Sequence, residues 1–283
     1  MTLSQYVAGC ISRLSPLYDA GEARWLMRII FEHLKGWSQT DYVMNSDREI
    51  SQELISLTEP ILDRLMKNEP VQYILGETYW HGLRIKVAPG VLIPREETSE
   101  LIDIITSRET GQDLNVMDVC TGSGCIAIAL ARSLPFSSVT ATDISEKALA
   151  IASENISLLK ANVRTECCDA LACVESGHET YDIIVSNPPY IGDSERSGMD
   201  ANVLDYEPHI ALFVPDNDPL RFYRAISENS LMLLKKGGRL YFEINPLHSK
   251  ALKSMLAMNG WIDVEIIRDI HGKERFAVAV KPS

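Results

Sequence analysis

The fold is indicated by residues 116–133, which read VMDVCTGSGCIAIALARS. A strand-like run, 116–120, leads into the glycine turn 121–124, and an apolar helical stretch, 125–133, follows it. Strand, glycine turn and helix in this order form the first unit of a nucleotide-binding α/β fold, where the backbone approaches a ligand at a helix N-terminus. No Gly-Lys-Ser/Thr follows and the full G-x-G-x-x-G spacing is missing, so a phosphate loop is excluded and a nicotinamide site is disfavoured.

Three acidic residues accompany this unit. Asp143 ends the next predicted strand, 138–142, about 20 residues beyond the glycine turn, where a carboxylate can accept two hydrogen bonds from a ribose diol. Asp118 could reach the glycine turn and a ligand ammonium, or it could simply brace the turn. Asp169, after the strand-like run 163–167, lies where an adenine amine could be recognised, although Asp is also an ordinary turn residue.

A second motif, Asn187-Pro188-Pro189-Tyr190, follows the apolar run 182–186. The Asn187 side-chain oxygen and the Pro188 carbonyl are acceptors, and neither proline donates a competing N–H. The motif could therefore grip a planar NH2 group, with Tyr190 as an aromatic wall, or it could be only a tight turn. Both motifs follow predicted strands, so a parallel sheet would bring them into one crevice. Together they indicate S-adenosylmethionine, which has an adenosine, an ammonium and no phosphate, beside an amide that accepts the methyl group.

Further segments give the chain a family resemblance. They are residues 92–98 (LIPREET), Tyr206-Glu207-Pro208, Gly237-Gly238 and Glu243. With the two motifs, they resemble the release-factor glutamine methyltransferases over roughly residues 20–280. The resemblance implies a seven-stranded Rossmann-like class I methyltransferase sheet, a small N-terminal helical domain and a β-hairpin connector. It also implies S-adenosylmethionine as cofactor without a metal, and the glutamine of the Gly-Gly-Gln loop of class I peptide-chain release factors as substrate.

The expected site residues fall into three groups. The amide clamp, which we expect to aim the amide nitrogen at the methyl group, is Asn187, Pro188, Pro189 and Tyr190. The cofactor residues are Asp118, Cys120, Thr121, Gly122, Ser123, Gly124, Asp143, Asp169, Ala170 and Asn187. By resemblance, substrate contacts add Arg95, Glu97 and Thr98 to the clamp, although these residues could merely begin a helix over 97–107. Glu243 is expected to support the clamp, and the loop 192–217, which contains Glu207, could close over the substrate.

Three positions depart from the resembled family. It usually has glycine at Cys120, proline at Glu96 and an aromatic residue at Ala170. Related ribosomal-protein glutamine methyltransferases often carry cysteine at the position of Cys120, so methylation of a ribosomal protein stays open as an alternative function. Two further functions also stay open, namely an adenine amino-methyltransferase that acts on nucleic acid and a cofactor-binding protein without catalysis.

The composition limits the partners and the cellular compartment that we expect for this protein. The 283 residues are 46% apolar, and the net charge of −12 with a pI near 5.0 disfavours direct nucleic-acid binding. No apolar stretch approaches about 18 residues, and no basic segment followed by an apolar core opens the chain. We expect a cytoplasmic monomer with no membrane contact. The six cysteines form no C-x-x-C pair, which argues against a metal and for buried, reduced thiols: Cys10, Cys120, Cys125, Cys167, Cys168 and Cys173.

The chain is expected to divide into three parts. Residues 1–70 are predicted to be helical, with entries at Thr2-x-x-Gln5, Asp19-x-x-Glu22 and Ser46-x-x-Glu49, and the resemblance implies that they help to hold the release factor. Residues 71–93 are predicted to form a β-hairpin linker. Residues 94–283 form the expected methyltransferase domain. Its predicted strands are 116–120, 138–142, 163–167, 182–186, 239–244 and an antiparallel pair, 261–268 and 275–280.

Overall fold

The computed structural model describes residues 1–172 and 180–283, and it divides into two compact units. The first unit comprises Met1–Gly76 with Asp200–Tyr206, and the second comprises Glu77–Met199 with Glu207–Ser283. The division thus falls at Gly76 rather than at residue 70. The reason is helix α5 (Val71–Leu75), which replaces the start of the predicted hairpin segment and buries Val71 in the core of the helical unit.

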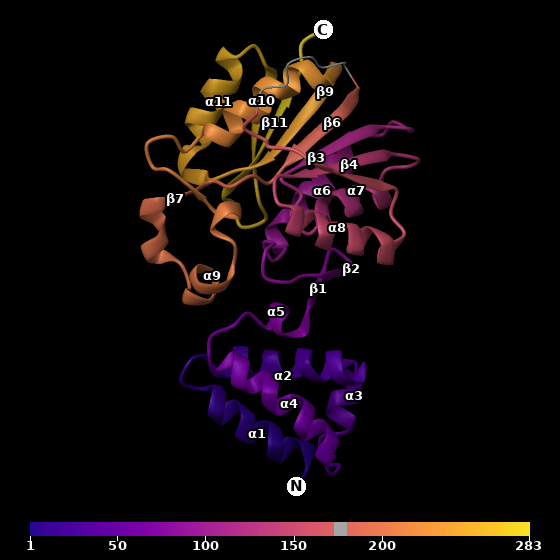
Figure 1. Cartoon of the computed structure of the whole chain (residues 1–283), viewed down its shortest axis with the longest axis vertical. Helices are drawn as coiled ribbons and strands as arrows, with labels where there is room; N and C mark the ends of the chain where they lie inside the picture. The colour runs from indigo at the N-terminus through magenta and orange to yellow at the C-terminus, as the bar shows by residue number, and fades with distance from the viewer. Residues whose placement is uncertain (173–179) are drawn as a thin grey trace. The chain divides into compact units, whose positions relative to one another are not determined.

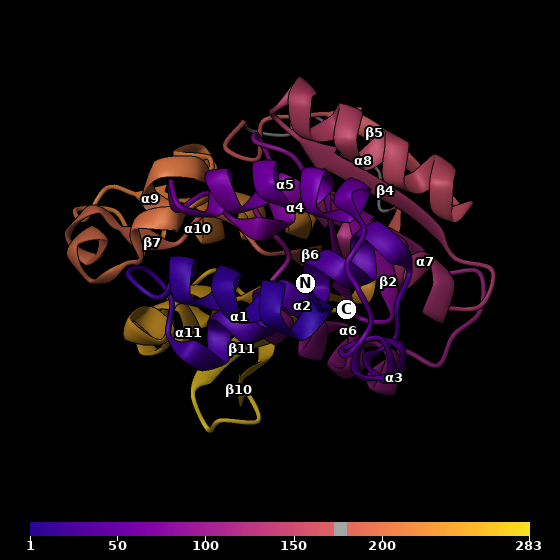
Figure 2. The ribbon, with the colours of Figure 1, turned by 90° about the horizontal axis from the view of Figure 1, so that it is seen from below.

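The helical unit is built from amphipathic helices around one apolar core. Leu14, Met27 and Phe31 are fully buried in it. Figures 1 and 2 show α1, α2 and α4 lying against one another. Helix α9 joins this unit, where the Tyr206 hydroxyl donates to the Lys67 carbonyl at 2.7 Å. The helices are α1 (Leu3–Leu14), α2 (Ala20–Lys35), α3 (Gln39–Met44), α4 (Gln52–Leu65), α5 and α9 (Ala201–Tyr206).

Two of the three predicted helix entries are confirmed. Thr2 forms a capping box with Gln5, and the Asp19 carboxylate accepts from the first backbone N–H groups of α2. The entry at Ser46 is wrong. Ser46 instead lies in a turn that follows α3, Glu49 makes an antiparallel bridge to Thr2, and α4 begins after Ser51.

The second unit begins with an antiparallel hairpin of β1 (Glu77–Trp80) and β2 (Leu83–Lys86). Trp80 is fully buried, and its indole N–H donates to the Arg95 carbonyl at 2.7 Å. The hairpin is therefore anchored to the segment that leads into α6 (Glu96–Arg108). Glu96 is the first residue of α6, where both an acidic residue and the proline usual in the resembled family are favourable.

A seven-stranded sheet forms the centre of this unit, as predicted (Figure 1). Its order is β10-β11-β9-β6-β3-β4-β5, and β11 runs antiparallel to both of its neighbours. Strand β9 begins at Leu234 rather than at residue 239, so Gly237-Gly238 lies inside it. A Cβ on Gly238 would lie 3.0 Å from the Asp182 carbonyl, which explains the need for glycine there. The strands are β3 (Asn115–Val119), β4 (Ser138–Asp143), β5 (Val163–Cys167), β6 (Tyr181–Ser186), β9 (Leu234–Glu243), β10 (Ile262–Arg268) and β11 (Glu274–Val280).

Helices cover both faces of the sheet. Helices α6, α7 (Cys125–Ser133) and α8 (Glu146–Leu159) pack on one face, and α10 (Arg221–Leu233) with α11 (Ser249–Met258) packs on the other (Figures 1 and 2). A short parallel pair, β7 (Ile191–Gly192) and β8 (Phe213–Val214), lies beyond the main sheet. Within residues 1–172 and 180–283, no helix combines the length and the apolar character that a membrane span requires.

The cysteines differ in part from the prediction. Cys10 and Cys125 are buried, Cys120 is half-buried, and Cys167 and Cys168 are exposed. The last two lie at and just beyond the end of β5, which is an edge strand and is therefore covered on fewer sides. Cys173 lies outside the described residues.

Candidate functional site

The turn between β3 and α7 has a left-handed backbone at three positions. The φ angles are +62° at Cys120, +57° at Gly122 and +81° at Gly124. A Cβ on Gly124 would also lie only 3.1 Å from the Cβ of Ala152, so this residue permits close packing of α7 on α8. Cys120 occupies a left-handed conformation that favours glycine, which accounts for the glycine that the family usually has at this position. For a residue with a side chain this conformation costs roughly 1–2 kcal/mol.

Asp118 lies fully buried beneath this turn. One carboxylate oxygen accepts from the Thr121 hydroxyl at 2.6 Å and from the Ala127 backbone N–H at 3.2 Å. Ala127 lies in the first turn of α7, where backbone N–H groups have no partner within the helix. Burial raises the pKa of Asp118 to about 7, although these two hydrogen bonds oppose the rise. The contacts support the loop-bracing role, and Asp118 does not line the adjoining cavity.

Asp143 is the last residue of β4, Asp169 follows β5, and both line the cavity. One Asp143 oxygen accepts from the Gly122 N–H at 2.9 Å, and the other accepts from the Ser145 N–H at 2.9 Å. Asp143 therefore holds the glycine turn while its carboxylate borders the cavity. Asp169 accepts from the Leu171 N–H at 2.9 Å, which fixes a turn that presents Ala170 to the same cavity.

The amide clamp begins directly after β6. Asn187 and Pro189 line the cavity, whereas Pro188 and Tyr190 do not. The Asn187 amide nitrogen lies 3.4 Å from the Thr98 hydroxyl oxygen. The Tyr190 hydroxyl donates to Glu243 at 2.9 Å, so the tyrosine is tied to the end of β9. Its expected role as an aromatic wall stays a prediction, because Tyr190 does not line this cavity.

The segment 92–98 borders the cavity through several residues, including Arg95 and Thr98. The Arg95 guanidinium pairs with Glu207 at 2.6 Å, and the second Glu207 oxygen accepts from the Ile93 N–H at 3.1 Å. The side chain of Glu207 is only 1% exposed, so both carboxylate oxygens are used inside the protein. Glu207 therefore fastens this segment, and Glu97, which was also expected at the site, does not line the cavity.

A single cavity of about 330 Å³ joins the glycine turn and the amide clamp. This volume lies in the range of small-molecule sites. Its lining also includes residues that the sequence did not indicate. Ile210 and Phe213 fall in the loop expected to close over the substrate, whereas no motif marks Ile144 or the start of α10. The residues missed are Gly90, Val91, Ile144, Ser145, Ala148, Cys168, Leu171, Ile210, Ala211, Phe213, Arg221 and Phe222.

The residues that line the cavity are suited to bind an organic ligand that carries hydroxyl and amine groups. Asp143 and Asp169 can accept hydrogen bonds, and apolar side chains provide walls for flat or aliphatic groups. In the part of the chain that the structure describes, no three His, Cys, Asp or Glu side chains come together as a group able to hold a metal ion.

A seven-stranded sheet with a reversed β11, a glycine turn after β3 and an Asn-Pro-Pro-Tyr clamp after β6 defines an S-adenosylmethionine-dependent methyltransferase. Family comparisons agree with this class. Residues 96–203 match the Methyltransferase small domain, and residues 8–76 match the PrmC N-terminal domain.

Individual relatives narrow the class to a family. A release factor glutamine methyltransferase from Bacteroides thetaiotaomicron is 46% identical over 266 residues, which are 94% of this chain and 95% of the relative. Another, from Flavobacterium psychrophilum, is 38% identical over 97% of this chain and 98% of its own length. A methyltransferase of known structure from Pyrococcus furiosus shares the fold, with a TM-score of 0.52 and 20% identity over 71% of this chain and 90% of that one. The chain belongs to the release factor glutamine methyltransferase family.

Proposed function

We propose that this protein transfers a methyl group from S-adenosylmethionine to the side-chain amide nitrogen of the glutamine in the Gly-Gly-Gln loop of class I peptide-chain release factors. The observation that carries this proposal is the shared cavity, since Asn187 and the glycine turn line it together. Relatives named release factor glutamine methyltransferase match almost the whole chain, including the helical unit.

The cavity residues fit S-adenosylmethionine. Asp143, at the end of β4, would accept the ribose hydroxyls, and Asp169 would accept the adenine amine. Ile144 and Leu171 would contact the flat adenine, and the left-handed turn at Gly122 lets the backbone come close. When bound, the cofactor supplies an electrophilic methyl group on a sulfonium, which needs no metal.

The protein's task is then to hold the acceptor amide. A carboxamide nitrogen is a poor nucleophile because its lone pair is delocalised into the carbonyl. The Asn187 side-chain oxygen and the Pro188 carbonyl would accept its two hydrogens and hold the nitrogen in line with the methyl group. Positive charge that develops on this nitrogen would strengthen both hydrogen bonds, so the clamp favours the transition state over the ground state.

The helical unit is the proposed holder of the release factor. Residues 8–76 match the PrmC N-terminal domain and lie within the compact helical unit. The net charge of −12 supports a protein substrate rather than a direct contact with nucleic acid. We also propose that the protein acts as a monomer.

Mass spectrometry of a purified, unmethylated release factor, incubated with this protein and S-adenosylmethionine, tests the proposal. We expect one added methyl group on the Gly-Gly-Gln glutamine and none when the protein carries Asn187→Ala. A ribosomal protein and a single-stranded oligonucleotide serve as competing substrates. Methylation of either one in place of the release factor, or no transfer despite calorimetrically measured cofactor binding, would overturn it.

A further inference from the structure

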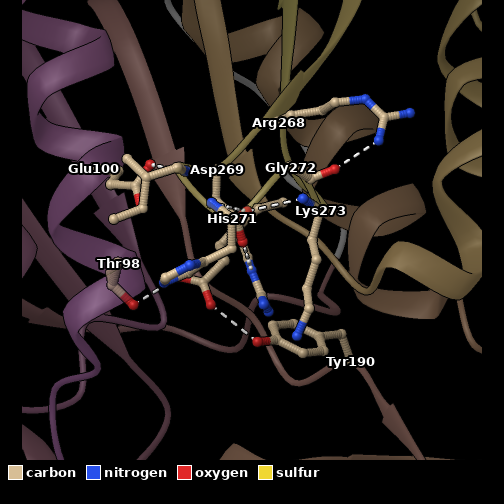
Figure 3. Close-up of polar contacts among 11 residues, drawn as sticks. Thr98, Glu100, Tyr190, Arg268, Asp269, His271, Gly272 and Lys273 are labelled. Carbon is tan, nitrogen blue, oxygen red and sulfur yellow. Dashed lines mark hydrogen bonds and ion pairs between the residues drawn. The ribbon is translucent and has the colours of Figure 1, made fainter.

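Glu243 ends β9 directly behind the amide clamp and is 2% exposed. Each of its carboxylate oxygens accepts a hydroxyl hydrogen, one from Thr98 at 2.6 Å and one from Tyr190 at 2.9 Å. Figure 3 draws both hydrogen bonds as dashed lines from the hydroxyls of the labelled Thr98 and Tyr190. Glu243 thus links α6 to the clamp without touching the cavity itself.

The Thr98 hydroxyl has only one hydrogen, and the contact with Glu243 uses it. The Thr98 oxygen can therefore only accept a hydrogen bond from its other neighbour, Asn187. Accordingly, the Asn187 group that lies 3.4 Å from Thr98 is the amide nitrogen. The side-chain oxygen of Asn187 is then the end left for the cavity, which is the polarity required to accept a hydrogen from a substrate amide.

A second set of contacts favours the ionised form of Glu243, which can only accept hydrogen bonds, against the effect of its burial. Burial raises the pKa of Glu243, while hydrogen bonds from Thr98 and Tyr190 and the positive charge of Arg275 oppose this rise. The Arg275 side chain is held by Asp269 at 3.3 Å. The Asp269 side chain is fully buried and also accepts from the His271 and Lys273 N–H groups in the β10–β11 turn (Figure 3).

We propose that Glu243 and Thr98 make the acceptor site select a glutamine amide over a glutamate carboxylate, by fixing which end of the Asn187 amide faces the cavity. The inference rests on the proposed function. Thr98 and Glu243 are positioning residues, because they act through Asn187. If the amide were reversed, an NH2 group would face the substrate, which repels an incoming amide N–H and welcomes a carboxylate.

Equilibrium binding provides the test without any turnover. The protein is saturated with S-adenosylhomocysteine, and its affinity is measured by calorimetry for an unmethylated release factor and for the same factor with Gly-Gly-Glu in place of Gly-Gly-Gln. Contacts outside the loop are common to both partners, so the ratio of the two affinities reports on the acceptor site. We expect the unsubstituted protein to prefer glutamine by at least about 30-fold, from one well-placed polar group.

Substitutions at Thr98 separate the hydroxyl from packing. Thr98→Val keeps the volume and Thr98→Ala reduces it, but both lack the hydroxyl, and we expect both to lower the preference by about tenfold. Thr98→Ser keeps the hydroxyl, so its preference for glutamine should stay within about threefold of that of the unsubstituted protein. A full preference in both hydroxyl-free variants, with melting temperatures that show them folded, would overturn the inference.

A change at Asn187 supplies an independent check. Asn187→Asp presents an oxygen in either orientation, so Thr98→Val should lower kcat by at least tenfold in the Asn187 protein but by less than about twofold beside Asn187→Asp. Equal losses in both backgrounds would contradict the inference. A glutamine preference that depends on Thr98, in a protein that methylates no release factor, would instead reject the proposed function and leave the amide-selective site standing.

Discussion

The glycine turn and the amide clamp both follow parallel strands and both line one cavity, but they are held in different ways. The turn is fixed by carboxylates that accept nearby N–H and hydroxyl groups. Asp118 contacts residues 3 and 9 positions away, and Asp143 contacts Gly122, which is 21 positions away. The clamp is fixed by side chains from three elements, with separations of 89 residues between Asn187 and Thr98, 53 between Tyr190 and Glu243, and 145 between Thr98 and Glu243.

This difference separates two kinds of site. In the proposed function the turn would hold a cofactor that many methyltransferases share, and the geometry of the turn is encoded almost entirely in one βαβ unit. The clamp would hold the particular acceptor, and the geometry of the clamp depends on how α6, β6 and β9 pack together. Damage to the turn should therefore appear in cofactor binding and stability, whereas damage to the clamp should appear in transfer.

The largest effect is expected when the clamp loses its side-chain acceptor. Asn187→Ala should lower kcat by about 10³-fold, because a transition-state hydrogen bond disappears, while the cofactor Kd changes by less than about threefold. Single-turnover transfer and calorimetry measure the two quantities. If the cofactor affinity fell as far as kcat, the clamp and the turn would not be separate in function.

The next effect concerns the buried carboxyl beneath the turn. Folded Asp118 keeps its proton up to a pKa of about 7, whereas an ordinary Asp loses it near 3.8. Its contribution to the free energy of unfolding is therefore complete below about pH 4 and is lost as pH rises to about 7, by up to roughly 4 kcal/mol. Urea unfolding of the protein and of Asp118→Asn across pH 4 to 8 should show this loss only with Asp118 present. Parallel curves would contradict the prediction.

A smaller effect is expected at the rim of the turn. Asp143→Ala should raise the cofactor Kd by about 30-fold, because the ligand hydroxyls and the Gly122 N–H each lose an acceptor. Glu166→Ala is a matched control, since Glu166 is an exposed acidic residue opposite Thr142 in the β4–β5 register and does not line the cavity. Similar affinities for the two variants would show that the turn is not held as described.

The smallest effect is expected at Cys120. Cys120→Gly removes the strain of a side chain at a φ of +62° but makes the unfolded chain more flexible, so the free energy of unfolding should change by less than about 1 kcal/mol. Cys120→Val, which is β-branched, should be less stable than either. A loss above about 2 kcal/mol in the glycine variant, measured by urea unfolding, would mean that the cysteine side chain holds the turn.

The sequence predicted the parts of this protein whose geometry is local. Strand, glycine turn and helix follow one another within residues 116–133, so their order and their glycines suffice to indicate the first unit of the α/β fold. The seven-stranded sheet was expected from the family resemblance, and it is confirmed. The helix entries at Thr2 and Asp19 were predictable for the same reason, since each cap binds residues within three positions. Ser46 has the same spacing but was wrong, because the distant Thr2 pairs with Glu49 and prevents a helix there.

Only the tertiary structure decided which way the Asn187 amide is turned. That polarity depends on Thr98, Tyr190 and Glu243, which are far apart in the sequence and meet only when β6 and β9 pair and α6 packs against β9. The same holds for Phe222 at the cavity and for α9, which joins the helical unit. A motif specifies the groups that are present, but the direction of a hydrogen bond is set by every neighbour that competes for the same proton.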